Sequence, residues 1–283
     1  MTQYEIHGPD FNLELTMTCG QTFCWHRTDG ELYGEGSSKF YTFRKEKPLI
    51  VEQKGEKILA ETELPEKEVR KALGLDYNLE GIFSTFPEDN KLSEAKNQLK
   101  GMRIINDEFF PCLISYLCSP QMRIPRIKQM HNSMAEKYGE KVSYGEEELL
   151  RFPTLEELSK ASEEELRDLG LGYRAEYVVE TVKILEDEGL AVSDDYEEAR
   201  EDLKKLYGVG DKVADCVLLF SMNFHEAYPL DTWALKAVEN HYPDLHANDY
   251  EEASKNLREY FGPYSGYAQE YLFHAARKGL IEV

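Results

Sequence analysis

The segment Leu206–Asp231 constrains this chain more than any other part of its sequence. It contains a Gly-Val-Gly turn at residues 208–210, which lies between two stretches of helical pattern. A glycine has no Cβ, so a turn with two of them can lie very close to another molecule. The amides after the turn open a helix, and unpaired N–H groups at a helix start bind phosphate. The segment therefore predicts two helices joined by a hairpin whose backbone can bind a phosphate.

Two reactive side chains accompany this hairpin. Lys212 lies in the first turn of the second helix, where the helix dipole disfavours a protonated amine. An amine that is neutral can form a Schiff base with a sugar carbon. Asp231 lies at the expected N-cap of the next helix, where an ionised carboxylate can stabilise an oxocarbenium ion. We therefore expect chemistry on a nucleic acid. The alternatives are a non-catalytic lysine beside a phosphate and an aspartate that only caps its helix.

The composition excludes several classes of protein. The 283 residues, 41% of them hydrophobic, are enough for one large domain or for two to three subdomains. No apolar run reaches the length of about 18 residues that a membrane span needs, and the first residues lack the features of a signal peptide. We therefore expect a cytoplasmic protein, nucleoid-associated if its source is prokaryotic. The five cysteines form no C-x-x-C pair, so we expect no disulfide framework, no metal site and no cofactor.

The net charge of −21 argues at first sight against a nucleic-acid partner, because DNA-binding proteins gain affinity from basic residues on phosphates. The acidic residues, however, form runs such as 163–165 and 194–198, which we interpret as solvated helix faces. Local geometry can overrule net charge. Basic residues are expected to collect elsewhere, at Arg123, Arg126, Lys128, Arg174, Lys204 and Lys205.

The chain divides into a β-rich part and a helical part. Short alternating stretches at 11–16, 31–33, 40–44 and 49–53 predict an antiparallel sheet with one covered face, and a helical pattern follows at Pro65–Leu73. From about residue 92 the pattern is helical to the end. We therefore predict an α+β fold with an antiparallel β domain over residues 1–95, packed on a larger all-α body over residues 96–283.

Local signals mark several helix ends. Asn106 or Asp107 can begin a helix over Phe109–Cys118, and capping boxes begin at Thr154 and Ser162. The helix from Ser162 is expected to end at the glycines of 170–172.

Other side chains are spaced so that they can form a base pocket. Cys216 lies four residues after Lys212 on the same helix face, and Gln269 and Phe273 have the same spacing. A glutamine amide beside an aromatic ring can read a base edge while the ring stacks on it. Tyr173 follows a helix end and can enter a duplex as a wedge. The alternatives are a small buried thiol, a surface amide and two aromatic rings that serve packing only.

Together these segments give the chain a specific resemblance. From roughly Phe11 to Arg277 it resembles the 8-oxoguanine DNA glycosylase/lyases of the helix-hairpin-helix superfamily. The motifs that carry the resemblance are Cys19-Gly-Gln-Thr-Phe-Cys-Trp25, Leu169-Gly-Leu-Gly-Tyr-Arg-Ala-Glu-Tyr177, Gly208-Val-Gly-Asp-Lys-Val-Ala-Asp-Cys216, Pro229-Leu-Asp231 and Gly262-Pro-Tyr-Ser-Gly-Tyr-Ala-Gln-Glu-Tyr-Leu-Phe273. The resemblance implies a TBP-like sheet domain and a helix-hairpin-helix at about 204–216.

The resemblance also implies roles for the matching residues. Lys212 would be the Schiff-base nucleophile at the deoxyribose C1′, and Asp231 the carboxylate that assists departure of the base. In the base pocket, Gly20 would accept the N7 hydrogen of 8-oxoguanine, Cys216 and Phe273 would sandwich the flipped base, and Gln269 would read its Watson–Crick edge.

On the DNA, the hairpin glycines Gly208 and Gly210 would bind phosphate, and Tyr173 would be the duplex wedge. Arg174 and Arg126 would contact the estranged cytosine. The implied partner is double-stranded DNA with oxidised guanine, and we expect a monomer that needs no protein partner.

The chain departs from the family pattern in three places. Gln121-Met-Arg123 stands where the family has an asparagine-rich turn, so Gln121 is the candidate that fills the gap opposite the flipped base. Tyr207 replaces a proline in the hairpin, and Trp233 replaces a phosphate-contacting histidine. Two other functions are consistent with the architecture. A monofunctional alkylpurine glycosylase would use water where Lys212 stands, and a helix-hairpin-helix module that only binds DNA would need no base pocket.

Overall fold

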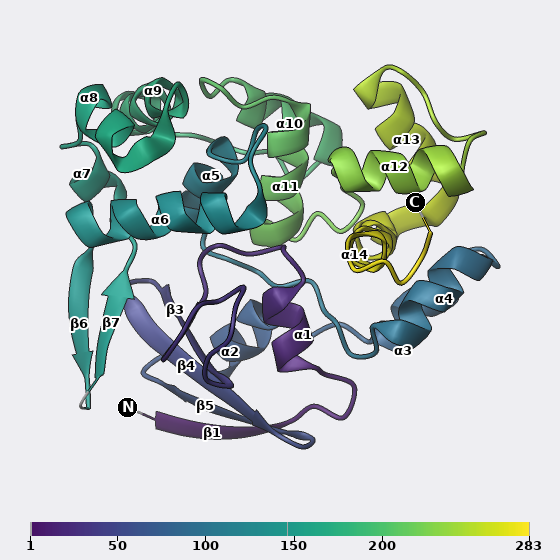
Figure 1. Ribbon diagram of the computed structural model, residues 1–283, viewed down its shortest axis with the longest axis horizontal. Coiled ribbons are helices and arrows are strands. Elements are labelled where there is room, and N and C mark those ends of the chain that lie inside the picture. Colours follow the sequence, from purple (N-terminus) through teal and green to yellow (C-terminus); the bar gives the residue numbers. More distant parts are fainter. Residues whose placement is uncertain (1, 146, 283) are drawn as a thin grey trace.

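The computed structural model describes residues 2–145 and 147–282 of the chain. A β-sheet lies at one end of the molecule and a larger helical body covers it, with the short helix α1 (Leu13–Thr18) between them (Figure 1). This arrangement confirms the predicted α+β fold with its small antiparallel sheet. The predicted boundary at residue 95 remains a prediction.

The sheet has, within the described residues, five antiparallel strands in the order β1-β5-β4-β3-β2. Their bounds are β1 Thr2–His7, β2 His26–Arg27, β3 Lys39–Arg44, β4 Lys47–Lys54 and β5 Lys57–Thr62. In register, Phe40 lies opposite Val51, which lies opposite Ala60. These three side chains belong to one buried cluster with Trp25 and Ile105, so the linker to the helical body completes the core of the sheet.

The helices of the body follow in chain order. Their bounds are α2 Glu66–Ala72, α3 Leu79–Ser84, α4 Asn90–Gln98, α5 Phe109–Leu117, α6 Ile124–Tyr138, α7 Leu155–Leu158, α8 Glu163–Leu166, η1 Arg167–Leu171, α9 Arg174–Asp187, α10 Tyr196–Lys204, α11 Asp211–Ser221, α12 Thr232–His241, α13 Tyr250–Phe261, η2 Gly262–Tyr264 and α14 Ser265–Arg277. The helices predicted at Pro65–Leu73 and Phe109–Cys118 agree with α2 and α5 to within one residue at each end. No helix in the described part of the chain is both long and apolar enough to cross a membrane.

Local capping explains several of these bounds. Thr154 and Ser162 form the two predicted capping boxes with Glu157 and Glu165, and each glutamate side chain returns to the N-cap amide. Gly170, with a φ of 87°, interrupts the helical conformation within η1, and Gly172, with a φ of 61°, follows its last residue. These predictions from the sequence are confirmed.

In the sheet domain, two predicted strands are wrong and other strands were missed. Residues 13–18 form helix α1 instead of the strand expected at 11–16, because Asn12 accepts from the Leu15 amide and Leu13 and Met17 are buried on one helical face. The stretch 31–33 is a turn closed by the Ser37 amide on the Asp29 carbonyl. The predominantly exposed edge strand β1 and strand β5 were not predicted.

The helical body also contains a β-hairpin. Strands β6 (Glu140–Tyr144) and β7 (Glu147–Arg151) pair with each other and extend from α6 alongside the sheet (Figure 1). The expectation of an all-helical body is therefore wrong at this point. The predicted N-caps of α5 are also wrong, because Asn106 and Asp107 bond other elements and Glu108 precedes the helix.

Gln21 connects the loop after α1 to the linker that enters the body. Its Nε2 donates to the carbonyl oxygens of Thr16 (2.9 Å) and Arg103 (2.8 Å), and its Oε1 accepts from the Ile105 amide at 3.0 Å. The side chain is buried, so these bonds satisfy backbone groups that have no access to water.

We expect the substitution Gln21→Leu to lower the free energy of unfolding by about 3 kcal/mol, because it leaves several buried backbone groups unpaired. Chemical denaturation measures this change. Gln98→Leu, at the exposed end of α4, is the control and should change stability by less than about 0.5 kcal/mol. Equal effects for the two variants would contradict the proposed role of Gln21.

Candidate active site

The site is a cavity of about 1010 Å³ that receives side chains from both halves of the chain. It lies between the loop after α1, the start of α6, the α10–α11 hairpin, the start of α12 and helix α14. Ten of the residues predicted from sequence line it: Gly20, Gln121, Tyr173, Gly208, Gly210, Lys212, Cys216, Asp231, Gln269 and Phe273. The fold thus brings together residues that are up to about 250 positions apart in the chain.

The hairpin between α10 and α11 forms one wall of the cavity. Gly208 has a φ of 83°, and a Cβ at this position would lie 2.5 Å from the ring of Tyr177, so the protein's own packing requires this glycine. Gly210 is different. It precedes α11 in extended conformation, and a Cβ there would meet no described atom within 4 Å. The open space at Gly210, beside the first amides of α11, suits a phosphate from another molecule.

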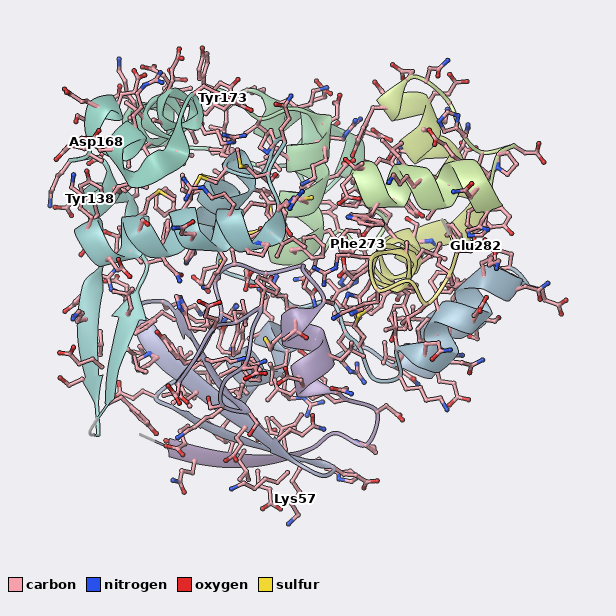
Figure 2. The ribbon with its side chains drawn as sticks, viewed as in Figure 1. Lys57, Tyr138, Asp168, Tyr173, Phe273 and Glu282 are labelled. Carbon is pink, nitrogen blue, oxygen red and sulfur yellow. The ribbon has the colours of Figure 1, made fainter. Side chains whose placement is uncertain are left out.

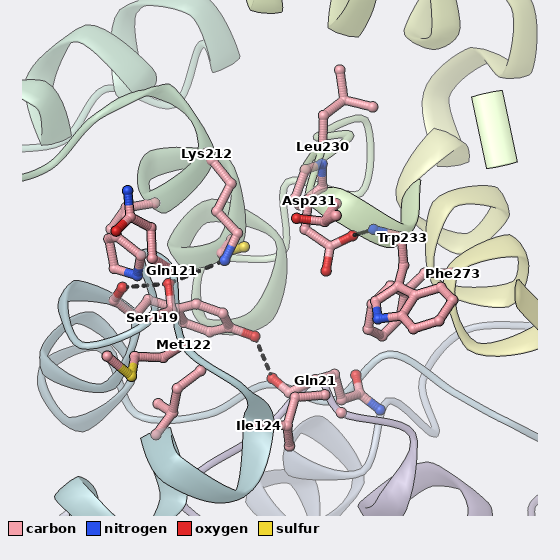
Figure 3. A pocket seen from close by; sticks show the side chains of 18 of the residues that line it. Gln21, Ser119, Gln121, Met122, Ile124, Lys212, Leu230, Asp231, Trp233 and Phe273 are labelled. Carbon is pink, nitrogen blue, oxygen red and sulfur yellow. Dashed lines mark hydrogen bonds between the residues drawn. The ribbon is translucent and has the colours of Figure 1, made fainter. Parts of the chain in front are cut away.

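Lys212 extends from the first turn of α11 into the cavity. Its Nζ donates to Ser119 Oγ at 3.1 Å and lies 5.1 Å from the centre of the Tyr116 ring. Figure 3 shows this amine and the carboxylate of Asp231 directed into the same space. A hydroxyl and an aromatic face hold the amine without an ion pair to a carboxylate in this arrangement.

The acidic neighbours of Lys212 on its own helix are paired elsewhere. Asp211 forms ion pairs with Arg200 at 3.0 Å and with Lys204 at 2.9 Å. Asp215 is fully buried, lies 3.3 Å from Arg200 Nε and accepts from the hydroxyls of Tyr196 and Tyr250 at 2.7 Å each. Arg200 on α10 thus neutralises both carboxylates that flank the lysine, which is an arrangement that the sequence alone could not show.

Asp231 caps helix α12 as predicted. One carboxylate oxygen accepts from the amides of Trp233 (3.0 Å) and Ala234 (2.8 Å). Burial raises the pKa of this carboxyl above its ordinary value, while the Ala234 amide, Lys212 and the Trp233 amide act in the opposite direction. The cap leaves the other carboxylate oxygen directed into the cavity (Figure 3).

The segment Cys19–Trp25 forms the opposite wall, and side chains bind almost every carbonyl group in it. The carbonyl of Cys19 accepts from His274 and Arg277, that of Gln21 from Tyr116 and that of Thr22 from Tyr33. Lys128 donates to the carbonyls of Phe23 (2.7 Å) and Trp25 (2.8 Å), and Thr42 to that of Cys24.

Gly20 is the exception within this segment. Its carbonyl has no hydrogen-bond partner among the described residues, and its φ of 116° is one that favours glycine. A Cβ at this position would lie 2.8 Å from Ile124 and 3.3 Å from the Phe273 ring. The segment therefore holds one free acceptor in a rigid frame beside Phe273.

The predicted base-pocket side chains are buried. Phe273 is 6% exposed and Cys216 is 3% exposed. Burial raises the pKa of the Cys216 thiol to about 12, so this sulfur is a neutral thiol at physiological pH. Gln269 is buried too, and its Oε1 has no partner in the described part of the structure. This buried amide oxygen can accept a hydrogen bond from a donor group of a bound ligand.

The predicted DNA-contacting side chains differ in their exposure. Tyr173 and Gln121 are exposed at the mouth, and Figure 2 places Tyr173 at the outer edge of the helical body, whereas Phe273 lies further inside. Arg174 and Arg126 do not line the cavity. Arg174 is buried and donates to the Pro120 carbonyl, and Arg126 donates to the Gly170 carbonyl at 2.9 Å.

The expected basic surface is therefore smaller than the sequence indicated. Lys128 is buried, and burial lowers its pKa to about 7. Lys204 and Lys205 pair with acidic neighbours. Arg123 is exposed on the lining of the cavity.

The lining residues that sequence reasoning did not single out include four with polar groups or an aromatic face that matter for the chemistry: Tyr116, Ser119, Glu270 and Arg277. Ser119 and Tyr116 become relevant only when α5 is placed beside Lys212, which no local pattern indicates. Glu270 carried a signal, because it is a carboxylate flanked by the apolar residues 267, 268, 271 and 272 on a helix. Among the described residues no cluster of ligands could hold a metal ion.

The chain matches known protein families and relatives over most of its length. Residues 4–113 match the model of the 8-oxoguanine DNA glycosylase N-terminal domain, and residues 114–263 match the HhH-GPD superfamily of base excision DNA repair proteins. The chain is 31% identical to a probable N-glycosylase/DNA lyase of Methanothermobacter thermautotrophicus over 96% of both sequences. It is 30% identical to an N-glycosylase/DNA lyase of Arabidopsis thaliana over 96% of this chain and 80% of the relative.

A solved structure agrees with these matches. The 8-oxoguanine glycosylase/lyase of Clostridium acetobutylicum, in complex with double-stranded DNA containing cytosine opposite 8-oxoguanine, superimposes with a TM-score of 0.85. The two chains are 31% identical, and the match covers 99% of each.

We expect Arg200→Met to lower the free energy of unfolding by about 3 kcal/mol, because it leaves the buried Asp215 without its cation. Chemical denaturation tests this. The matched control is Arg167→Met, which removes an exposed pair with Glu163 and should cost less than about 0.5 kcal/mol. If Arg200→Met lowered the free energy of unfolding no more than the control does, the ion pairs of Arg200 with Asp211 and Asp215 would not stabilise the hairpin.

Proposed function

Because the chain belongs to the HhH-GPD superfamily of base excision DNA repair proteins and to its N-glycosylase/DNA lyases, we propose that it removes 8-oxoguanine from duplex DNA, opposite cytosine, and then nicks the strand. The observation that carries this proposal is the meeting of Lys212, Asp231 and the free Gly20 carbonyl in one cavity. A lyase needs an amine nucleophile, a glycosylase needs stabilisation of a cationic sugar, and selection of the lesion needs an acceptor for its N7 hydrogen.

The reaction begins with extrusion of the lesion from the duplex. Unstacking a base costs a few kcal/mol, and without it no side chain can reach C1′. Tyr173 at the mouth enters the stack as a wedge, and the amides after Gly210 hold a backbone phosphate. The base then lies between the Cys216 thiol and the Phe273 ring, with Gln269 at its Watson–Crick edge.

Discrimination from guanine uses the Gly20 carbonyl. 8-Oxoguanine carries a hydrogen on N7, whereas guanine presents a lone pair there, which would face the carbonyl oxygen without a bond. A site built for a hydrogen bond strongly rejects the analogue that lacks the donor. The side-chain bonds to the neighbouring carbonyls of residues 19–25 keep this acceptor from moving away from guanine.

Bond cleavage follows at C1′. The bond from C1′ to N9 breaks, the base takes the electron pair and is protonated, and the carboxylate of Asp231 stabilises the cationic sugar. The neutral amine of Lys212 forms a bond to C1′ and gives one of its two protons to O4′ as the bond from C1′ to O4′ breaks and the sugar ring opens, which leaves an iminium that retains one N–H. The iminium acidifies C2′, and β-elimination then breaks the bond from C3′ to the phosphate oxygen.

The contacts of Arg174 and Arg126 suggest a role other than direct contact with the estranged cytosine. We infer that the two arginines position the strand-contacting loops 120–123 and 170–173, because they bind the carbonyls of Pro120 and Gly170. A direct contact with the estranged cytosine, as the family resemblance implies, would require them to exchange these bonds for the base. Gln121, with a φ of 57° at the exposed turn, is the candidate that fills the gap opposite the extruded base.

We expect Lys212→Gln to abolish strand cleavage and borohydride trapping on a duplex with 8-oxoguanine opposite cytosine, because the amide cannot form an imine. Binding of the lesion duplex should remain. Gel analysis of the trapped complex measures the first effect and fluorescence anisotropy the second. Lys205→Gln, an exposed lysine paired with Asp202, is the matched control and should trap like the wild type.

Undamaged and alkylated duplexes complete this experiment. Trapping by Lys212→Gln would remove this lysine from the nucleophile role. Base release from the alkylated duplex, without any adduct on the oxidised one, would identify a monofunctional alkylpurine glycosylase instead.

The electrostatics of the mouth lead to a second expectation. Because hairpin amides and few free basic side chains hold the DNA, the logarithm of the binding constant should fall with the logarithm of salt concentration with a slope of about −3, as for roughly three phosphates. Anisotropy titrations between low and physiological salt measure it. A slope equivalent to roughly ten phosphates would contradict the small footprint.

A further inference from the structure

Glu270 is a buried carboxyl group on the cavity wall that the proposed mechanism does not use. It lies on α14 between Gln269 and Phe273 and is 2% exposed. One of its carboxyl oxygens, Oε1, has no hydrogen-bond partner among the described residues. Burying a carboxyl group without full hydrogen bonding is costly, so a ligand that supplies the missing partner is the physical explanation for it.

The ionisable groups that interact with Glu270 come from several elements. They are Cys19 in the loop after α1, Asp231 at the start of α12, Arg277 on α14, and the tyrosines Tyr33 and Tyr116. The Cys19 thiol donates to the Thr16 carbonyl at 3.2 Å, and Arg277 donates to the carbonyls of residues 18 and 19.

Burial has the largest effect on the pKa of the Glu270 carboxyl group. It raises the pKa of Glu270 to about 8, while the bond with Cys19 and the charge of Arg277 lower it and the charge of Asp231 raises it. At pH 7 the group is therefore predominantly protonated, and it offers an O–H donor. Sulfur is a weak acceptor, so a carbonyl oxygen of a ligand is the better partner for that donor.

We propose that Glu270 is a specificity-determining residue that donates a hydrogen bond to the C8 oxygen of the extruded 8-oxoguanine. This inference rests on the proposed function. Its interaction with Cys19, the residue before Gly20, places the carboxyl group next to the segment whose Gly20 carbonyl accepts from N7 in that mechanism. The C8 oxygen is bonded to the carbon next to N7. A purine with an N–H group beside a carbonyl group thus satisfies both groups of the protein at once.

Guanine satisfies neither group. It carries a hydrogen on C8 in place of the oxygen and a lone pair on N7 in place of the hydrogen. Guanine would leave the Glu270 hydroxyl without an acceptor and oppose the Gly20 carbonyl with a lone pair. Two buried mismatches discriminate more strongly than one, because each unpaired group carries its own desolvation cost.

The experiment compares Glu270→Leu, which removes the donor, with Glu270→Gln, which keeps a neutral N–H donor of nearly the same shape. Single-turnover excision of 8-oxoguanine opposite cytosine is measured for each, together with binding of a duplex that carries a tetrahydrofuran abasic site. We expect Glu270→Leu to lower the excision rate by roughly tenfold or more and Glu270→Gln by less than about threefold at pH 7. Affinity for the abasic duplex should be unchanged, because it has no base to read.

The pH profile provides a second readout. Above pH 8 the ionised carboxylate of the wild type cannot donate, and its charge opposes the C8 oxygen, whereas the amide of Glu270→Gln does not titrate. The ratio of wild-type to Glu270→Gln rate should therefore be constant below about pH 7 and fall as the pH rises through about 8. Groups that titrate alike in both proteins, because they do not interact with residue 270, cancel in the ratio.

The outcomes separate the two proposals. If the wild type excises no 8-oxoguanine, the proposed function itself fails. If the wild type is active and Glu270→Leu matches it, Glu270 does not contact the base. If affinity for the abasic duplex falls as much as the excision rate, the residue has a structural role and the inference is overturned, as it is by a ratio that does not change with pH.

Discussion

The site depends above all on the fixed backbone of the segment Cys19–Trp25. Side chains from the sheet, from the turn at 31–33, from α5, from α6 and from α14 bind six of its seven carbonyl groups, and within the described residues only Gly20 keeps a free one. A flexible loop could turn this carbonyl away from an unmodified guanine. A loop held on both sides cannot do so without breaking several buried hydrogen bonds, so in the proposed mechanism the rigidity of the fold contributes to selectivity as much as the single acceptor does.

The strong negative charge is compatible with a DNA substrate because of how it is distributed. Around the hairpin, Arg200 pairs with the carboxylates of Asp211 and Asp215, so the charge nearest to Lys212 is balanced inside the protein. At the phosphate site proposed beside Gly210, the oriented amides of α11 would provide the positive potential that surface lysines provide in other DNA-binding proteins. In this proposal local dipoles replace net charge at that position.

The sequence predicted those features that have a local cause. The capping boxes at Thr154 and Ser162, the cap at Asp231 and the hairpin at 208–210 are each specified within a few residues, and the structure contains them. The stretch 11–16 was mistaken for a strand because six residues fit a period of two and a helical face equally well, and the Asn12 cap decided the outcome. Lys128 and Arg174 were expected on the surface, since their burial depends on carbonyl groups from distant segments. Ser119 and Tyr116 were missed for the same reason.

In the proposed mechanism the amine of Lys212 forms the covalent bond to the damaged nucleotide. Peptide mapping by mass spectrometry, after borohydride reduction of the complex with an 8-oxoguanine duplex and digestion of protein and DNA, can locate this bond. We expect the sugar remnant to be attached to Lys212 within the peptide that contains the hairpin. Attachment to any other lysine or to the N-terminal amine would show that Lys212 is not the nucleophile.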